Sequence, residues 1–194
     1  GDLTNLPLLR HIAALALPII LSTGMATLDE VEASVDALVT AGAKRQDITL
    51  LQCNTDYPTP WHDVNLRAME TMRRAFGTLV GLSDHTLGIH ISVAAPALGA
   101  CVIEKHYTLS RSLKGPDHPF AIEPAELREL VRQVREVEAA LGDGRKLGPV
   151  PEEAEMHQKA RRSLVAARAI PKGARIERDM VTIKRPGYGI KPKY

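Results

Sequence analysis

The sequence predicts an α/β protein built on a parallel sheet with helices outside it, either half of a (β/α)₈ barrel or a doubly wound sheet. Four short apolar runs recur between residues 18 and 106, and segments with helical periodicity separate them. No glycine-rich nucleotide-binding motif follows any of these runs, which lowers the expectation for a nucleotide-binding doubly wound sheet. The polar residues gather instead at the carboxyl ends of the runs.

The apolar runs have the length and composition of strands that are buried on both faces. Their starting points lie roughly 20 to 30 residues apart, which leaves room for a crossover helix between consecutive parallel strands. The four expected strands are Pro18–Thr23, Ile48–Cys53, Leu79–Ser83 and Ala100–His106.

Helical segments precede, separate and follow these strands. Thr27, with Glu30 three residues later, predicts a capping box at the start of one helix, and Gly42 predicts its end. A later helix begins at Pro124, because proline is favoured in the first turn. The other expected helices use the apolar positions Leu66, Met69, Met72 and Phe76, or span about Ile89–Leu98.

The composition changes near Leu141 and predicts three parts. Residues 1–141 form an α/β unit, and residues 142–162 form a linker because their first half is rich in glycine and proline. Residues 163–194 hold two small strands, Ser163–Ala167 and Met180–Lys184. About 30 residues are too few for a self-sufficient core.

Overall composition excludes several classes of protein. The 194 residues carry 25 Lys and Arg against 23 Asp and Glu, interspersed along the chain, so we expect no nucleic-acid partner. No apolar run approaches the roughly 18 to 20 residues of a membrane span. Cys53 and Cys101 lie in apolar runs, and neither a CxxC motif nor a secretory segment accompanies them. A reducing cytoplasm therefore fits best.

Two histidines form the strongest candidate site. His85 and His106 follow the third and fourth expected strands, whose carboxyl ends should lie side by side. Two neutral imidazoles suit a divalent first-row ion such as Mn²⁺, with oxygen ligands completing the shell. The alternative is that each histidine only caps its strand through hydrogen bonds.

Further polar residues follow the strands or their loops. Asp2 is either a third site residue or an acidic residue at a helix start. Asp117, in a Gly-Pro turn, is either a base or hydroxyl binder or a turn-capping residue. The Asn54–Pro60 loop could direct its hydroxyls and an amide toward a phosphate or sugar. The alternative is an ordinary rigid loop. Ser22–Met25 fits a strand end or a helix N-cap.

These motifs occur together in one order and spacing. They are GDLTN, PIILSTGMAT, CNTDYPTP followed by DVNL, GLSDHTLGI, VIEKHYTL, KGPDH and KRPGYGI. The set covers essentially the whole chain and resembles the sialic acid synthase family, meaning N-acetylneuraminate synthase and its bacterial relatives that make legionaminic or pseudaminic acid.

The resemblance implies a (β/α)₈ barrel, of which this chain carries about the second half, followed by part of an antifreeze-like (SAF) domain. The chain opens with Gly1 rather than Met, and we expect it to be a piece of something longer. In the family the SAF domain reaches into the active site of the other subunit of a swapped homodimer. The implied ligands are phosphoenolpyruvate, an N-acyl amino sugar and a divalent metal, Mn²⁺ or Mg²⁺.

The resemblance also assigns residues by motif position. It implies metal ligation by His85 and His106, catalytic or sugar-contacting roles for Asp2, Asp117 and Tyr57, and substrate binding by Ser83, Asn54, Thr55 and Arg185.

The implied activity is condensation of phosphoenolpyruvate with an N-acyl hexosamine and water, which gives a nonulosonic acid and phosphate. The acceptor is N-acetylmannosamine or a diacetamido trideoxy sugar, and the CNTDYPTP loop leans slightly toward the legionaminic type. One alternative is a non-catalytic half-barrel that binds a partner or dimerises through open strand edges. Another is a metal-dependent hydrolase on the same barrel.

Overall fold

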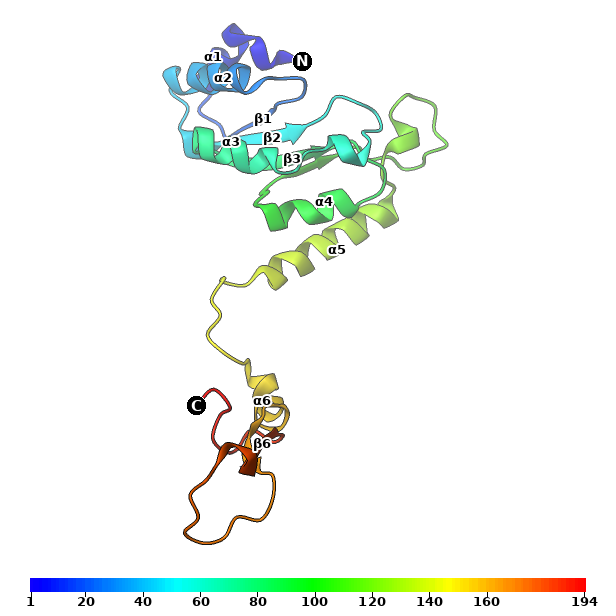
Figure 1. Ribbon diagram of the computed structural model, residues 1–194. Helices are drawn as coiled ribbons and strands as arrows, with labels where there is room; N and C mark the ends of the chain where they lie inside the picture. Colours follow the sequence, from blue (N-terminus) through cyan, green and yellow to red (C-terminus); the bar gives the residue numbers. More distant parts are fainter. The chain divides into compact units, whose positions relative to one another are not determined.

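The computed structural model describes residues 1–194 and divides them into two compact units, residues 1–143 and residues 144–194. The first unit holds a four-stranded sheet with its flanking helices, and the second holds a short α-helix and a two-stranded sheet (Figure 1).

The first unit is built on a four-stranded parallel sheet. Its strands are β1 (Ile19–Ser22), β2 (Ile48–Cys53), β3 (Leu79–Asp84) and β4 (Ile103–Lys105), and they neighbour one another in sequence order. A doubly wound sheet reverses its strand order partway, whereas a (β/α)₈ barrel does not. The observed order is therefore that of half a barrel, as predicted.

Helices connect the strands at the expected places. They are α1 (Leu6–Ala14), α2 (Leu28–Thr40), α3 (Ala68–Phe76), α4 (His90–Ala94) and α5 (Pro124–Leu141). The capping box predicted for α2 is present, because Thr27 accepts from the Glu30 amide and Glu30 accepts from the Thr27 amide. Short 3₁₀ turns occur at Asp2–Thr4, Arg45–Asp47, Trp61–Asp63, Ala95–Leu98, His118–Phe120, Pro151–Glu153 and Arg178–Met180.

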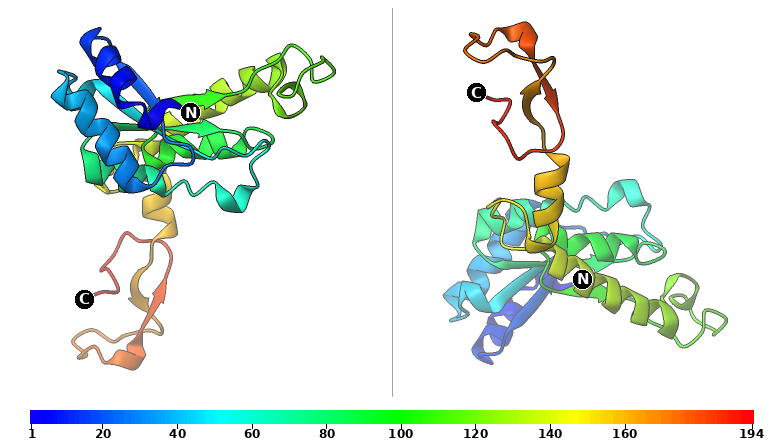
Figure 2. Two further views of the ribbon diagram at one scale, coloured as in Figure 1. Left: turned by 90° about the horizontal axis from the view of Figure 1, so that it is seen from above. Right: turned by 90° about the horizontal axis from the view of Figure 1, so that it is seen from below.

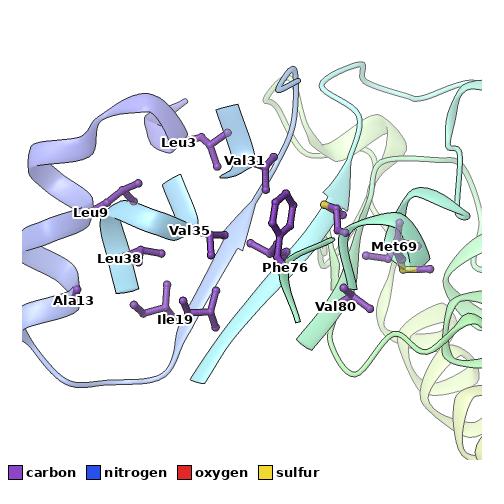
Figure 3. Packing of buried hydrophobic residues seen from close by; sticks show 14 of the residues in the cluster. Leu3, Leu9, Ala13, Ile19, Val31, Val35, Leu38, Met69, Phe76 and Val80 are labelled. Carbon is purple, nitrogen blue, oxygen red and sulfur yellow. The ribbon is translucent and has the colours of Figure 1, made fainter. Parts of the chain in front are cut away.

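The apolar core lies between the helices and one face of the sheet. Val35 and Leu38 of α2 are fully buried against Ile48 and Leu50 of β2. Figure 3 shows side chains of α1, α2 and α3 converging on the strands, and α1 and α2 lie side by side (Figure 2). The core thus occupies the sheet face that packs against the helices, and it leaves the strand ends available for polar residues.

The expectation that all four strands are buried on both faces is wrong for the two outer strands. β2 and β3 are largely buried, but Ile20 of β1 is 57% exposed and β4 has no buried residue. β1 and β4 are edge strands, each with a neighbour on one side only. β4 is also shorter than the predicted Ala100–His106, and α3 begins at Ala68 rather than near Leu66.

The second unit contains α6 (Ala154–Ala160) and an antiparallel pair, β5 (Ser163–Ala166) with β6 (Val181–Lys184). None of its apolar side chains is fully buried, in line with the expectation that so short a segment lacks a core of its own. Across the whole chain, no helix combines the length and the apolar character needed to cross a membrane.

Candidate functional site

The structure brings His85 and His106 together. Asp84 and Lys105 are register partners at the ends of β3 and β4, so the residues that follow them emerge next to each other. The centroids of the two imidazole rings lie 5.1 Å apart, and the rings meet edge to face at 84°. The parallel strand pairing therefore produces the juxtaposition inferred from the two motifs.

A hydrogen bond orients the imidazole of His85, and a carboxylate lies close to the imidazole of His106. Nδ1 of His85 lies 2.6 Å from the carbonyl oxygen of Asn54. A carbonyl accepts only, so Nδ1 carries the proton and Nε2 keeps its lone pair. Nδ1 of His106 lies 3.6 Å from the Asp117 carboxylate. Both rings are thus held from behind by an oxygen atom, the arrangement common for metal-binding histidines.

Tyr57 covers the histidine pair. Its ring centroid lies 4.3 Å from that of His85 and 5.7 Å from that of His106, and Phe120 contacts both Tyr57 and His106. Burial, followed by the nearby Cys53, Asp117 and Glu104, raises the pKa of the Tyr57 hydroxyl above its ordinary value. The phenol is therefore protonated at neutral pH and can donate a hydrogen bond.

Glu104 joins the same cluster through Ser83. The Ser83 hydroxyl donates to Oε1 of Glu104 at 2.6 Å, and it lies 3.5 Å from Nε2 of His85. Side chains alternate across a strand, so Ser83 and His85 share one face of β3 while Glu104 and His106 share the same face of β4. We refer to His85, His106, Tyr57, Glu104, Ser83, Asp117 and Phe120 as the strand-end cluster.

The opposite face of the same strand ends carries a buried ion pair. Nζ of Lys105 lies 3.0 Å from Oδ2 of Asp84, and the two side chains are 4% and 0% exposed. Burial alone would raise the pKa of Asp84, but the Lys105 ammonium, the Ser92 hydroxyl and the Thr86 amide together hold it below its ordinary value. Asp84 is therefore a charged, fully buried carboxylate directly beside His85.

The Asn54–Pro60 loop is fastened by its own hydrogen bonds. The side-chain amide of Asn54 donates to the Asp63 carbonyl at 2.8 Å, so this amide ties the start of the loop to the 3₁₀ turn that follows it. Thr55 is exposed and packs so close to Gly24 that a Cβ at Gly24 would lie 2.5 Å from its hydroxyl. A cavity of about 480 Å³, lined in part by Thr23 and Asn54, opens here.

Two residues assigned from motif position lie outside these contacts. Asp2 is exposed in the first 3₁₀ turn, and its carboxylate accepts a hydrogen bond from Asn5 rather than from any residue of the strand-end cluster. Arg185 directly follows β6 in the second unit.

A divalent ion would find two nitrogen ligands in the cluster. No group of three or more His, Cys, Asp or Glu side chains is arranged to hold a metal ion. The two imidazoles nevertheless fit such an ion, because the contact to Asn54 leaves Nε2 of His85 free to coordinate. Water and substrate oxygens would have to fill the remaining positions.

Glu104 lies in the VIEKHYTL motif, but the motif analysis gives it no role, and Phe120 lies outside the motifs. Glu104 could have been found from strand parity, because it stands two residues before His106 as Ser83 stands two before His85. Phe120 carries no such signal, since its ring reaches Tyr57 only through the fold of the loop after β4.

Comparison with known proteins agrees with this architecture. Residues 1–146 match the NeuB family and residues 161–194 match the SAF domain. The N,N'-diacetyllegionaminic acid synthase of Campylobacter jejuni is 52% identical over 98% of this chain and 57% of its own length. The N-acetylneuraminate-9-phosphate synthase of Homo sapiens is 40% identical over 95% of this chain and 50% of its own.

A solved structure is also similar. The N-acetylneuraminic acid synthetase of Leptospira borgpetersenii, a citrate complex, superposes with a TM-score of 0.72 at 38% identity, covering 80% of this chain and 53% of that one. The chain thus spans about half the length of the curated relatives it matches. By its matched residues and its relatives, the chain belongs to the NeuB family.

Proposed function

We propose that this chain carries the histidine-bearing half of a nonulosonic acid synthase. The reaction joins C3 of phosphoenolpyruvate to the aldehyde carbon of an N-acyl hexosamine, adds water at C2, and releases inorganic phosphate by C–O cleavage. The observation that supports this most directly is the strand-end cluster, in which His85 and His106 converge beneath Tyr57 and beside two carboxylates.

His85, through Nε2, and His106 would hold the metal, Mn²⁺ or Mg²⁺. When bound, such an ion supplies Lewis-acid polarisation of the aldehyde oxygen and can orient the water. The residues behind the rings hold the imidazoles in place, because the Asn54 carbonyl fixes the tautomer of His85 and Asp117 faces Nδ1 of His106.

The other members of the cluster would bind the substrates and accept a proton. The protonated Tyr57 hydroxyl and the exposed Asp117 carboxylate are suited to contact sugar hydroxyls. Glu104, whose Oε1 accepts a hydrogen bond from Ser83, is placed to accept a proton from a nearby water or hydroxyl. Ser83, Asn54 and Thr55 are proposed to bind substrate, and Asp2 to stabilise the cationic carbon electrostatically.

A diacetamido sugar of the legionaminic type is the preferred acceptor. Two relatives named N,N'-diacetyllegionaminic acid synthase are 52% and 43% identical to this chain, whereas a pseudaminic acid synthase is 37% identical. In the complete homodimer we propose that Arg185, from the SAF segment of the other subunit, contacts the N-acyl group. A cytoplasmic location goes with this proposal, since both cysteines are free thiols.

The test is a phosphate-release assay on a protein that extends this chain to the length of its relatives. It uses phosphoenolpyruvate with a panel of N-acyl sugars, with and without Mn²⁺. We expect release only when both a sugar and the metal are present, fastest with the diacetamido acceptor. Phosphate release without any sugar would refute the synthase assignment.

The open edges of the sheet favour a second candidate, a binding or dimerisation module. β1 and β4 each lack a partner on one side, and Ile20 of β1 is 57% exposed. Size-exclusion chromatography and the same assay on the 194-residue chain separate the two. Stable association without activity, in both the short and the extended protein, would support the binding module.

A further inference from the structure

We infer that the buried pair Asp84–Lys105 is a positioning device that sets the spacing and direction of His85 and His106. This inference rests on the proposed function, because the role of the histidines as metal ligands belongs to that proposal. Neither Asp84 nor Lys105 faces the substrate side of the sheet, so both act through the backbone of the residues they adjoin.

The pair is tied to the backbone of Thr86, the residue that follows His85. Oδ1 of Asp84 accepts from the Thr86 amide at 2.9 Å, and Nζ of Lys105 donates to the Thr86 carbonyl at 2.8 Å. Asp84 precedes His85 and Thr86 follows it, while Lys105 immediately precedes His106. One hydrogen-bonded unit therefore fastens both histidine backbones to each other across the β3–β4 pair.

A third element anchors this unit from the helical side. The Ser92 hydroxyl of α4 donates to Oδ2 of Asp84 at 2.5 Å, and Ser92 is fully buried. Asp84 thus accepts from an amide, a hydroxyl and an ammonium, and no charge is left unpaired. The strand ends cannot slide along each other without breaking at least one of these bonds.

Stability alone is a poor reason for such a pair. Taking two charges out of water costs several kcal/mol, and replacing a buried ion pair by apolar residues of similar volume is often neutral or stabilising. What an apolar pair cannot supply is direction, because dispersion contacts do not fix the angle between neighbouring backbones. A buried ion pair directly beside two converging imidazoles therefore fits a role in orienting those imidazoles.

The test uses the double variant Asp84→Asn/Lys105→Met in the protein that extends this chain to the length of its relatives. It removes both charges, keeps the side-chain volumes, and leaves no buried ion unpaired. We measure Mn²⁺ affinity by electron paramagnetic resonance and the thermal unfolding midpoint in the presence of a chelator. We expect a roughly tenfold or greater loss of affinity, the size typical for removing groups that orient metal ligands, with little change in midpoint.

Phe76→Leu is the matched control. Phe76 ends α3 near the start of β3, at the opposite end of the sheet from the histidines, and it is buried. This variant should lower the unfolding midpoint and leave the Mn²⁺ affinity unchanged. Unchanged affinity in a less stable protein would show that affinity does not simply follow stability.

Ser92→Ala keeps the experiment decisive if the double variant fails to fold. It removes one bond to Asp84 and leaves the ion pair, so a severalfold loss of Mn²⁺ affinity is expected. A metal-free readout accompanies it, namely the nuclear Overhauser contacts between the rings of Tyr57 and His85, which should weaken.

Two outcomes overturn the inference. If the wild-type chain binds Mn²⁺ and the folded variants bind it equally well, the positioning role is wrong while the proposed metal site stands. If the wild-type chain does not bind Mn²⁺, the inference fails together with the metal site of the proposed function.

Discussion

The Ser83 hydroxyl donates its proton to the Glu104 carboxylate across the β3–β4 pair, at 2.6 Å. Because the proton points to Glu104, the serine offers lone pairs rather than a donor to the rest of the strand-end cluster. A phosphate group, which needs donors, would have to compete with Glu104 for that proton. The charge of Glu104 also acts on Tyr57 from the same face.

Glu104→Gln should lower the pKa of Tyr57. The negative charge of Glu104 disfavours the phenolate, so its removal makes ionisation easier. Burial is the larger cause of the raised pKa and is unchanged, so the value should stay above the ordinary 10.0. The measurement is an absorbance titration of tyrosinate, with Tyr57→Phe identifying the signal. A rise, or no shift, in the pKa would contradict the assigned geometry.

His106→Ala should abolish Mn²⁺ binding and metal-dependent turnover while leaving the fold largely intact. The side chain is 30% exposed, and the backbone bond from the Ile122 amide to the His106 carbonyl remains. Binding is followed by electron paramagnetic resonance and folding by circular dichroism. His62→Ala, at an exposed histidine outside the cluster, is the control. Unchanged Mn²⁺ affinity in His106→Ala would remove this residue from the ligand set.

The loss of unfolding free energy caused by removing the carboxylate of Glu126 should become smaller as the pH falls. The Arg111 guanidinium holds the pKa of Glu126 below its ordinary 4.5, so the pair contributes stability above that pH and loses it as Glu126 protonates. Both side chains are partly exposed, so the effect at neutral pH should be below about 1 kcal/mol. Urea unfolding of wild type and Glu126→Gln should differ at pH 7, and the difference should shrink as the pH falls below 4.5. If the difference in unfolding free energy between the two proteins grew on acidification, the stabilising role of this ion pair would be contradicted.

Thr27→Ala should destabilise the first unit by about 1 kcal/mol. The Thr27 side chain accepts from the Glu30 amide at the start of α2, and alanine leaves that amide without its partner. Glu32→Ala, at an exposed position of the same helix, is the control and should stay close to wild type. Equal unfolding free energies for Thr27→Ala and Glu32→Ala would argue against the capping box.

Much of the fold is readable from local patterns. The α2 cap at Thr27 and Glu30, the proline at the start of α5 and the four apolar runs each depend on residues close in sequence. Short-range sterics and hydrogen bonds decide such features, so a single sequence carries them. Exposure of β1 and β4 was not readable in this way, because an apolar run does not reveal whether a neighbour covers it.

The strand-end cluster, too, was only partly readable from the sequence. The spacing of the motifs already places His85 and His106 at neighbouring strand ends. The contact of Glu104 with Ser83, the covering ring of Phe120 and the ion pair Asp84–Lys105 depend on register and loop path. A shift of one residue in the register of β4 would move Glu104 and Lys105 to the opposite faces of the sheet and break both of their contacts with β3.

From its sequence alone this protein is determined to be a chain of alternating strands and helices with two histidines at adjacent strand ends. Periodicity and turn chemistry act over a few residues and are written in the order of the amino acids. Only the tertiary structure decided which side chains share a face, how the imidazoles are oriented and where the buried charges find partners. Those outcomes depend on contacts between residues far apart in the chain. A local sequence pattern does not predict the free energies of such contacts.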